Sequence, residues 1–399
     1  MNYQKFPVQP AVGLNRRALL KSGLLLAGGL SVGGALTGCS SGLPATGGVS
    51  SASGSAGGAT TQRPTELFTR SDTAGEVSPL TAELGLCMVQ VQGAIKQFTD
   101  AAEAKAKALG LQINQAINGS NSTKAVSQLN SLLQRNIGAL FIQDLNPASQ
   151  VPVIKQAIGQ GMFTSAFNMP ASMQLTASQY EVGKQLAEGT LRYIADRLGN
   201  QAKIVHFNTD YNEALAPRDR GWREVMATKP PGVEIVADIP GNPETQEQGN
   251  TAMASFLQKD PSVNVVDGGD TLVLGALSAL RAAGRANDPS LALFGVNGDP
   301  QAVNEVASGG PYKATYAFNF AILGTLVSDM AQRWLKGLTV PQLVIVPAVQ
   351  IDSKDAIDTY NKSVADPGAA YDTAGDTYFK LYGTTSYQTR GSFFDGTVS

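Results

Sequence analysis

The sequence predicts an α/β protein whose parallel sheets are divided between two lobes. From about residue 82, short apolar stretches alternate with longer amphipathic ones. This is the pattern of repeated βα units, which build parallel sheets covered by helices on both faces. The alternation continues for about 300 residues, which is more than one hydrophobic core usually serves. We therefore expect two lobes, each built on its own sheet.

The predicted strands are apolar stretches that are too short to be helices. In chain order they are Leu84 to Gln90, Gln112 to Ala116, Ala139 to Gln143, Met162 to Phe167, Lys203 to Phe207, Val233 to Asp238, Val263 to Val266, Leu291 to Gly295 and Ala314 to Phe318. The predicted helices have apolar residues at helical spacing, and most begin or end at Gly, Asn, Asp or Thr. They are Thr99 to Leu109, Thr123 to Arg135, Glu181 to Leu198, Asn250 to Gln258, Thr271 to Ala283 and Ala321 to Lys336.

The N-terminal residues have the pattern of an export signal that ends at a lipid attachment site. Arg16 and Arg17 precede an apolar run from Leu19 to Leu36, and small residues then lead to Cys39. We expect residues 1–38 to be a cleaved signal peptide of the twin-arginine type with a lipobox, and Cys39 to be lipidated. A transmembrane helix is disfavoured, because glycines and serines interrupt a run that is shorter than the roughly 20 apolar residues that span a bilayer.

The residues that follow this signal cannot form a core of their own. From Ser40 to about Pro64 they are almost wholly Ser, Gly, Ala and Thr, which bury too little apolar surface to become ordered. We expect residues 39–81 to be a flexible tether. The protein is therefore expected outside the cytoplasm, in the periplasm or on the outer face of the cell membrane, and held to the membrane by its lipid.

Charge and cysteine content exclude one class of partner and one source of stability. The formal net charge is −2, and removal of the four basic residues of the signal lowers it to −6. A mildly acidic protein has no electrostatic reason to bind nucleic acid. Lipidation of Cys39 would leave Cys87 without an intramolecular partner, so we expect Cys87 to be a buried, inert thiol in a core that no disulfide supports.

Polar side chains follow the predicted strands at the positions where function is expected. In open α/β sheets, a ligand lies beyond the carboxyl ends of the strands. The residues at those ends include Gln90, Gln92, Phe167, Asn168, Asp267, Asp270, Asn297, Phe318 and Asn319. Amides, carboxylates and a guanidinium make paired hydrogen bonds to neighbouring hydroxyls, and aromatic rings cover the apolar face of a sugar. The set indicates an uncharged, polyhydroxylated ligand.

Some of these residues have a second, structural explanation. Asp267, Asp270 and Asn297 are equally well explained as caps of the helices that follow them. Trp222 is more simply explained as a side chain that packs on the sheet. Arg218 differs, because a cation close to the start of a helix gains nothing from the helix dipole, so a ligand or a nearby acid must explain it.

The sequence lacks the residues of several common enzyme classes. His206 is the only histidine, and it lies inside an apolar strand, where a core residue is favoured over a catalytic one. There is no HExxH motif, no CxxC pair and no GxxxxGK[ST] loop, which disfavours metal hydrolysis, thiol redox and P-loop chemistry. We expect no enzyme activity, no metal and no cofactor. A carboxylate pair for glycoside hydrolysis, whose spacing is spatial, stays open as an alternative.

The order of several segments resembles that of the periplasmic sugar-binding proteins of the ribose and galactose type. The segments are Leu86 to Leu111, Thr123 to Asn146, Arg218 to Gly221, Gly269 to Leu277 and Phe294 to Gly298, and the resemblance runs from about Glu83 to Ile351. It implies two Rossmann-like lobes joined by a three-stranded hinge, the type I fold of periplasmic binding proteins. It also implies that a monosaccharide is held between the lobes and delivered to an ABC permease with its ATPase.

The resemblance implies how the chain is divided. Residues 82–177 and 319–350 would form the first lobe, and residues 178–318 and 351–365 the second. The chain crossings would fall near Gln174 to Gln179, Phe318 to Asn319 and Ala348 to Asp352. The aromatic-rich extension, residues 366–399, is expected to pack on a lobe instead of trailing free.

The candidate ligand-binding residues are Gln90, Gln92, Phe167, Asn168, Arg218, Asp270, Asn297, Phe318 and Asn319. The chain departs from the ribose binders at some of the places that the resemblance implies. Phe167 and Asn168 replace an Asp-Arg pair, Gly269 replaces an Asn, and Asn297 replaces an Asp. Each replacement removes a charge or a hydrogen-bonding group. Ribose is therefore disfavoured, while another sugar, a polyol or a modified sugar stays open.

Other functions share this architecture or this chemistry. An extracytoplasmic sugar sensor or chemoreceptor component would use the same binder, and a carbohydrate-active enzyme would turn its ligand over. The effector-binding half of a transcription regulator would need a DNA-binding helix-turn-helix, where this chain has the signal and the tether. We favour a monomeric substrate-binding lipoprotein of an ABC importer, which closes on its ligand by hinge motion.

Overall fold

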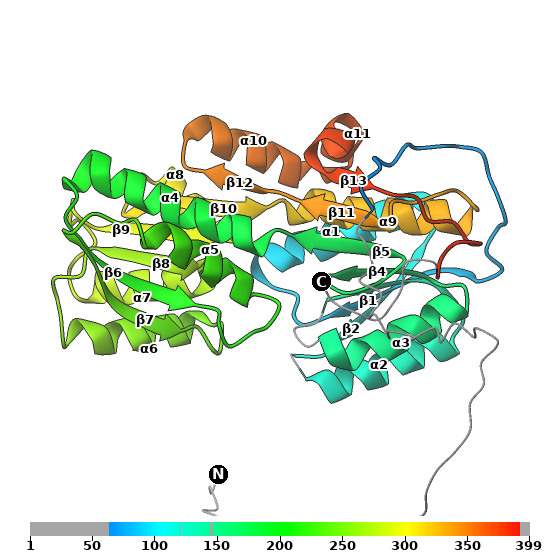
Figure 1. Cartoon of the computed structure of the whole chain (residues 1–399), viewed down its shortest axis with the longest axis horizontal. Helices are drawn as coiled ribbons and strands as arrows, with labels where there is room; N and C mark the ends of the chain where they lie inside the picture. The colour runs from blue at the N-terminus through cyan, green and yellow to red at the C-terminus, as the bar shows by residue number, and fades with distance from the viewer. Residues whose placement is uncertain (1–63, 120, 144–146, 392–399) are drawn as a thin grey trace, which may run out of the picture. The chain divides into compact units, whose positions relative to one another are not determined.

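The computed structural model describes residues 64–119, 121–143 and 147–391, all within the unit Gly58–Ser399 (Figure 1). The predicted signal peptide, Cys39, most of the tether and residues 392–399 of the extension lie outside the described residues. Within the described part, no helix is both long enough and apolar enough to cross a bilayer. The chain forms two largely parallel sheets with helices packed on them, which confirms the predicted α/β fold class.

The first sheet has seven strands in the order β13-β11-β5-β4-β3-β1-β2. Their bounds are β1 (Thr81–Met88), β2 (Gln112–Ile117), β3 (Ile137–Ile142), β4 (Phe163–Phe167), β5 (Met173–Ala177), β11 (Leu343–Val346) and β13 (Lys380–Tyr382). All neighbours pair in parallel except β11 and β13, which are antiparallel. Together with this sheet, the seven-stranded lobe comprises α1 (Gly93–Leu109), α2 (Ser122–Gln134), α3 (Pro147–Gly159), α9 (Phe320–Leu335) and α11 (Pro367–Tyr378).

Both faces of this sheet are covered, and β1 shows why its residues form a buried strand. Leu84, Leu86 and Met88 pack with residues of α1 and α9, whereas Cys87 packs with residues of α2 and α3. Figure 1 shows α2 and α3 below this sheet and α9 above it. Because successive side chains of a strand point to opposite faces, a strand covered on both sides has a continuous apolar sequence. Cys87 is fully buried, as predicted.

The second sheet has six strands in the order β12-β10-β9-β8-β6-β7. Their bounds are β6 (Ala202–Asn208), β7 (Val233–Pro240), β8 (Val265–Gly269), β9 (Ala292–Val296), β10 (Tyr312–Phe318) and β12 (Ala348–Ile351). Only β12 pairs antiparallel, with β10. Together with this sheet, the six-stranded lobe comprises α4 (Gln179–Leu198), α5 (Ala216–Met226), α6 (Gln246–Leu257), α7 (Asp270–Ala282), α8 (Pro300–Ala307) and α10 (Lys354–Ala365).

The described chain crosses between the lobes four times: between β5 and α4, at Asn319 between β10 and α9, at Pro347 between β11 and β12, and at Asp366 between α10 and α11. The fourth crossing is additional to the three that the resemblance implied. The third crossing precedes the range Ala348 to Asp352 that the resemblance implied. Pro347 has no N–H to donate to a sheet, so the pairing of β11 ends before it and β12 pairs with β10 after it. Residues 348–350, which the sequence analysis assigned to the first lobe, therefore lie in the six-stranded sheet.

Two terminal segments pack on the seven-stranded lobe. β13 extends its sheet, and the Tyr371 hydroxyl of α11 donates to Asp329 Oδ2 of α9 at 2.8 Å. The last part of the predicted tether lies here too: Phe68 N donates to Leu381 O at 2.9 Å, and Arg70 Nη1 lies 3.2 Å from Asp329 Oδ2. The expectation of a flexible tether does not hold for this part, because Phe68 and Arg70 make contacts that the polar composition of the stretch concealed.

Helices α6 and α7 approach so closely that only glycine fits at their contact. A Cβ on Gly249 would lie 2.1 Å from the carbonyl oxygen of Leu272, and a Cβ on Gly275 would lie 2.1 Å from that of Gln246. Both distances are far below van der Waals contact, so any side chain here must push the helices apart. The two glycines therefore allow α6 and α7 to pack backbone against backbone.

We predict that Gly249→Ala lowers the free energy of unfolding by about 2 kcal/mol or more, because the added methyl group overpacks a contact that involves backbone. Urea denaturation measures this difference. The control is Gly159→Ala at the end of α3, where a Cβ meets nothing within 4 Å. Alanine is the better helix former, so the control should keep or slightly raise the stability. Equal denaturation midpoints for Gly249→Ala and the wild type would contradict the close approach.

Candidate ligand-binding site

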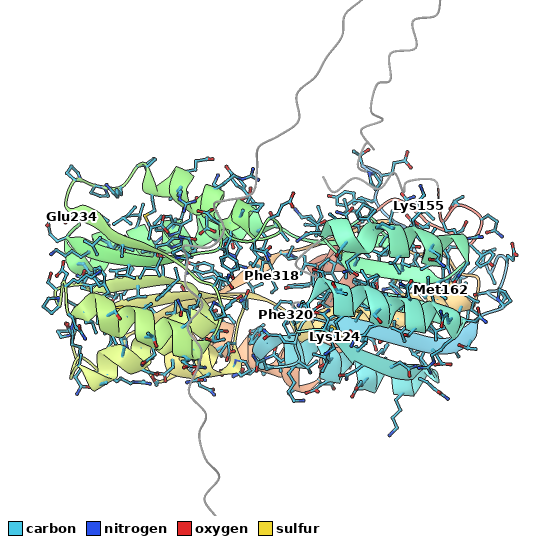
Figure 2. All side chains as sticks on the ribbon, turned by 90° about the horizontal axis from the view of Figure 1, so that it is seen from below. Lys124, Lys155, Met162, Glu234, Phe318 and Phe320 are labelled. Atoms are coloured by element: carbon cyan, nitrogen blue, oxygen red, sulfur yellow. The ribbon has the colours of Figure 1, made fainter. Side chains whose placement is uncertain are left out.

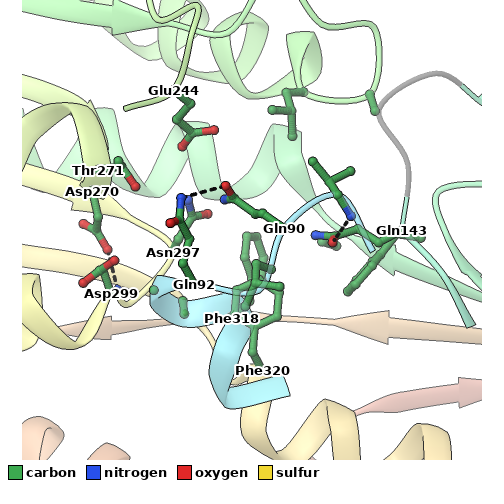
Figure 3. A pocket seen from close by; sticks show the side chains of 18 of the residues that line it. Gln90, Gln92, Gln143, Glu244, Asp270, Thr271, Asn297, Asp299, Phe318 and Phe320 are labelled. Atoms are coloured by element: carbon green, nitrogen blue, oxygen red, sulfur yellow. Dashed lines mark hydrogen bonds between the residues drawn. The ribbon is translucent and has the colours of Figure 1, made fainter. Parts of the chain in front are cut away.

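A cavity of about 630 Å³ lies at the junction of the two lobes. Its walls come from the loops after β1, β3 and β4 on one side, and from α5 and the loops after β7, β8 and β9 on the other. Figure 2 labels Phe318 and Phe320 at this junction, and Figure 3 shows the lining side chains from close by. The volume is in the range of small-molecule sites.

Among the described lining residues, the wall from the seven-stranded lobe carries no charged side chain. Its polar groups include the amides of Gln90, Gln92, Gln143 and Asn168. Gln92 Nε2 donates to Gln90 Oε1 at 2.9 Å, and Val89 N donates to Gln143 Oε1 at 3.3 Å (Figure 3). Because each amide has both donors and acceptors, this wall offers further hydrogen bonds in both directions.

Three phenylalanines form the apolar part of the cavity. Phe167 is the last residue of β4, Phe318 is the last residue of β10, and Phe320 begins α9. The Phe320 ring meets those of Phe167 and Phe318 edge to face, with centroid distances of 6.4 and 6.1 Å. Because the rings pack edge to face, they form one ordered apolar surface at the cavity.

The wall from the six-stranded lobe holds the charged groups of the described lining, namely Arg218, Glu244, Asp270 and Asp299. Arg218 is 4% exposed, and its Nε and Nη2 donate to Gln179 Oε1 at 3.0 and 2.8 Å. Burial lowers the pKa of the guanidinium, and the nearby carboxylates, Glu244 foremost, oppose this effect. Of the two explanations expected for Arg218, a ligand or a nearby acid, the nearby acid is therefore present at the cavity.

Asp270 lines the cavity and also connects neighbouring loops. Its carboxylate accepts hydrogen bonds from Tyr312 Oη at 2.7 Å, Thr315 Oγ1 at 2.9 Å and Asp299 N at 2.8 Å. Burial raises the pKa of Asp270 to about 6, although these bonds oppose the rise. The Asp270 side chain therefore positions Asp299 and the loop after β9. It has this role instead of capping the helix that follows it, which was the structural explanation expected from the sequence.

Asn297 and Asp299 lie together in that loop. Asn297 has a φ of 117°, in a region that favours glycine, and its Oδ1 lies 3.5 Å from Arg218 Nη2. Asp299 caps α8, because its Oδ1 accepts from Gln301 N at 2.9 Å. Burial raises the pKa of Asp299 above its ordinary value. Asn297 thus faces the cavity beside Arg218, and Asp299 is partly occupied by its helix.

The structure brings all the candidate ligand-binding residues to this cavity except Asn319. Asn319 Oδ1 accepts from Ile322 N at 3.2 Å, and its Nδ2 donates to Ser363 Oγ at 2.6 Å. It therefore caps α9 at the second crossing, pointing away from the lining that Phe318 and Phe320 form. Four further lining residues were not predicted, although each follows a strand and could have been found by that rule: Gln143, Glu244, Asp299 and Phe320.

Behind the cavity, a buried network fixes the start of α5. His206 Nδ1 lies 2.6 Å from Asp267 Oδ1, and its Nε2 lies 2.8 Å from Asp219 Oδ1. The imidazole stacks on Trp222, whose Nε1 donates to Asp267 Oδ2 at 2.8 Å. Burial lowers the pKa of His206, but the two carboxylates outweigh it and raise the pKa to about 9. Asp219 follows Arg218, so this imidazolium holds the turn of helix that carries Arg218.

The family comparison gives the identity of the fold. A family model described as the periplasmic binding protein domain matches residues 88–339. The chain belongs to this family. It is therefore a solute-binding protein of the ABC importer type, not an enzyme, and it works outside the cytoplasm. The predicted family and function class are confirmed.

Individual relatives support this assignment. The chain is 25% identical over 227 residues to the D-apiose import binding protein of Actinobacillus succinogenes, covering 55% of this chain and 71% of the relative. It is 26% identical over 282 residues to the xylitol-binding protein of Mycolicibacterium smegmatis, covering 69% and 79%. A solved structure from Mycobacterium smegmatis in complex with β-D-fucofuranose has a TM-score of 0.64 at 19% identity, covering 75% and 99%, and shows the same fold.

We predict that the stability of the protein falls as the pH rises from about 6.5 to about 9. The pKa of His206 is raised in the folded state, so its charge stabilises the fold fully below pH 6.5 and is lost as pH passes 9. The loss should be roughly 3 kcal/mol, since one pKa unit corresponds to about 1.4 kcal/mol. Urea denaturation at several pH values measures it.

His206→Gln is the matched variant, because His206 is the only histidine in the chain. This variant should be less stable than the wild type at pH 6 and should lack the slope between pH 6.5 and 9. A wild type with the same stability at both ends of that window would mean that His206 is neutral in the folded protein.

Proposed function

We propose that this protein captures an uncharged monosaccharide or polyol in the cavity between its lobes and delivers it to the permease and ATPase of an ABC importer. The proposal rests on one cavity whose two walls carry different kinds of side chain. Amides and the rings of Phe167 and Phe320 line one side, a guanidinium with carboxylates lines the other, and Phe318 lies at the crossing between the lobes. Such groups pair with hydroxyls and cover the apolar face of a sugar. The relatives named for D-apiose and xylitol support this ligand class.

The ligand contacts in this proposal come from both lobes. They are Gln90, Gln92, Phe167, Asn168, Arg218, Asp270, Asn297 and Phe318. A ligand that touches both walls gains contacts only where the walls lie close together, so it shifts the population toward a closed arrangement. The crossings at Asn319 and Pro347 are among the segments that would act as the hinge.

The attachment of the protein is part of the same proposal. Export by the twin-arginine route and lipidation of Cys39 are supported by the sequence pattern of residues 15–39. A membrane-tied monomer next to its permease would meet that partner without a search through the surrounding volume, because a tether raises the effective concentration.

We predict that Arg218→Ala abolishes the rise in melting temperature that a bound sugar or polyol causes. A ligand at 100 times its Kd stabilises the wild type by about 2.7 kcal/mol, because it binds only the folded form. Without the guanidinium, the ligand hydroxyls next to position 218 lose their charged hydrogen-bond donor. Thermal-shift screening with xylitol, D-apiose and related polyols measures the effect.

Arg223→Ala is the control, because Arg223 lies on the same helix but pairs with Asp210 and Asp238 outside the cavity lining. It should keep the full shift. The unliganded Arg218→Ala protein should melt close to the wild type, since burial of the guanidinium opposes its charge. A full ligand shift in Arg218→Ala would remove this residue from the site.

A further inference from the structure

Glu244 is a carboxylate at the cavity for which the described residues provide no hydrogen-bond or ion-pair partner. It lies in the loop between β7 and α6, next to Thr245, whose side chain caps α6 by accepting from Gln248 N. Figure 3 shows Glu244 on the opposite side of the cavity from Phe318 and Phe320. In the described part of the chain, its carboxylate makes no hydrogen bond and no ion pair. Asp270 and Asp299, by contrast, already accept hydrogen bonds from the protein.

Glu244 and Arg218 interact without touching. Burial raises the pKa of Glu244 and Arg218 opposes that rise, while Glu244 is the foremost group that supports the charge of Arg218. The two side chains nevertheless form no direct ion pair within the described residues. Arg218 uses Nε and Nη2 on Gln179, and Nη1 makes no hydrogen bond to any described residue. An acceptor and a donor of opposite charge thus face the same space.

The Glu244 carboxylate also lies in space that a side chain at position 269 would fill. A Cβ built on Gly269 would lie 2.8 Å from Glu244 Oε1, so a side chain at position 269 would displace this carboxylate from its present place. Gly269 is the position where the resemblance to ribose binders implied an Asn. The absence of a side chain at position 269 therefore leaves room for the Glu244 carboxylate in the six-stranded wall.

A hydroxyl group is the chemical partner that fits between these two side chains, because it donates one hydrogen bond and accepts others. We infer that Glu244 is a specificity-determining ligand contact, which accepts hydrogen bonds from hydroxyls that Arg218 donates to, and which thereby selects an uncharged ligand with adjacent hydroxyls. An anionic sugar acid is repelled by Glu244. The inference rests on the proposed function and adds the residue that enforces it.

The test compares Glu244→Gln with the wild type by isothermal titration calorimetry. The probes are xylitol and D-apiose, each with its aldonate, xylonate or apionate. Gln keeps the size of Glu but not its charge, and hydrogen bonds to charged groups contribute about 1.5 to 3 kcal/mol, or roughly 10-fold to 100-fold in affinity. The variant should therefore bind the neutral probe at least 10-fold more weakly. Its preference for the neutral probe over the aldonate should fall by at least 10-fold.

Glu247→Gln is the matched control, since Glu247 lies on the exposed face of the first turn of α6 and not in the cavity lining. It should leave both the affinity and the preference unchanged. If the wild type binds a neutral probe and Glu244→Gln binds it equally well with the same preference, the inference is overturned and the proposed function stands. If the wild type binds none of these neutral probes, the proposed function and the inference both fail.

Discussion

The site depends on how α4 and α5 pack, because that contact places a buried cation at the cavity. A Cβ on Gly183 would lie 1.9 Å from the carbonyl oxygen of Arg218, and one on Gly221 would lie 2.1 Å from that of Tyr180. The two helices therefore touch through their backbones. α4 also supplies Gln179, the acceptor for Arg218, directly after the first crossing between the lobes. On the other side, the imidazolium of His206 holds Asp219. Arg218 is thus fixed before any ligand arrives, and binding need not order it.

The two walls of the cavity suggest a division of work. The described wall of the seven-stranded lobe offers neutral amides and aromatic rings, which tolerate ligands of several shapes. The other wall offers fixed charges, and a charged group left unpaired in a closed cavity is costly. In the proposed function, the first wall would therefore supply general affinity for sugars and polyols, and the second the penalties that distinguish one ligand from another.

Much of this could be predicted from the sequence, because the strands of buried parallel sheets are continuous apolar runs and their ends are polar. The positions of Gln90, Asn168 and Asn297 follow from that rule alone. Other features could not be predicted this way. Asn319 lies at a strand end like the rest, but capping of α9 claims its side chain. β5 and β11 are short and were not predicted, and Pro152 inside α3 conceals a helix.

Glu244 shows a different limit of sequence reasoning. Its carboxylate lies close to Gly269 in the fold, although the two residues are distant in the chain. Likewise, Leu67 and Phe68 are two apolar residues in a mostly polar stretch, and the sequence alone does not show that Phe68 N donates to Leu381 O. A local pattern can identify which elements form, but such pairs exist only after the lobes have assembled.

The meeting of the two terminal segments has a mechanical consequence. Leu67 bridges to Tyr382 at the edge of the seven-stranded sheet, and Arg390 Nε donates to Ile158 O of the same lobe at 3.0 Å. A force applied at either end of the described chain therefore acts on the seven-stranded lobe. The six-stranded lobe is joined to it by the crossings and by side-chain contacts such as Tyr360 Oη to Gln97 Oε1 at 2.9 Å. In the proposed hinge motion, the six-stranded lobe would therefore move while the lobe that bears the ends stays in place.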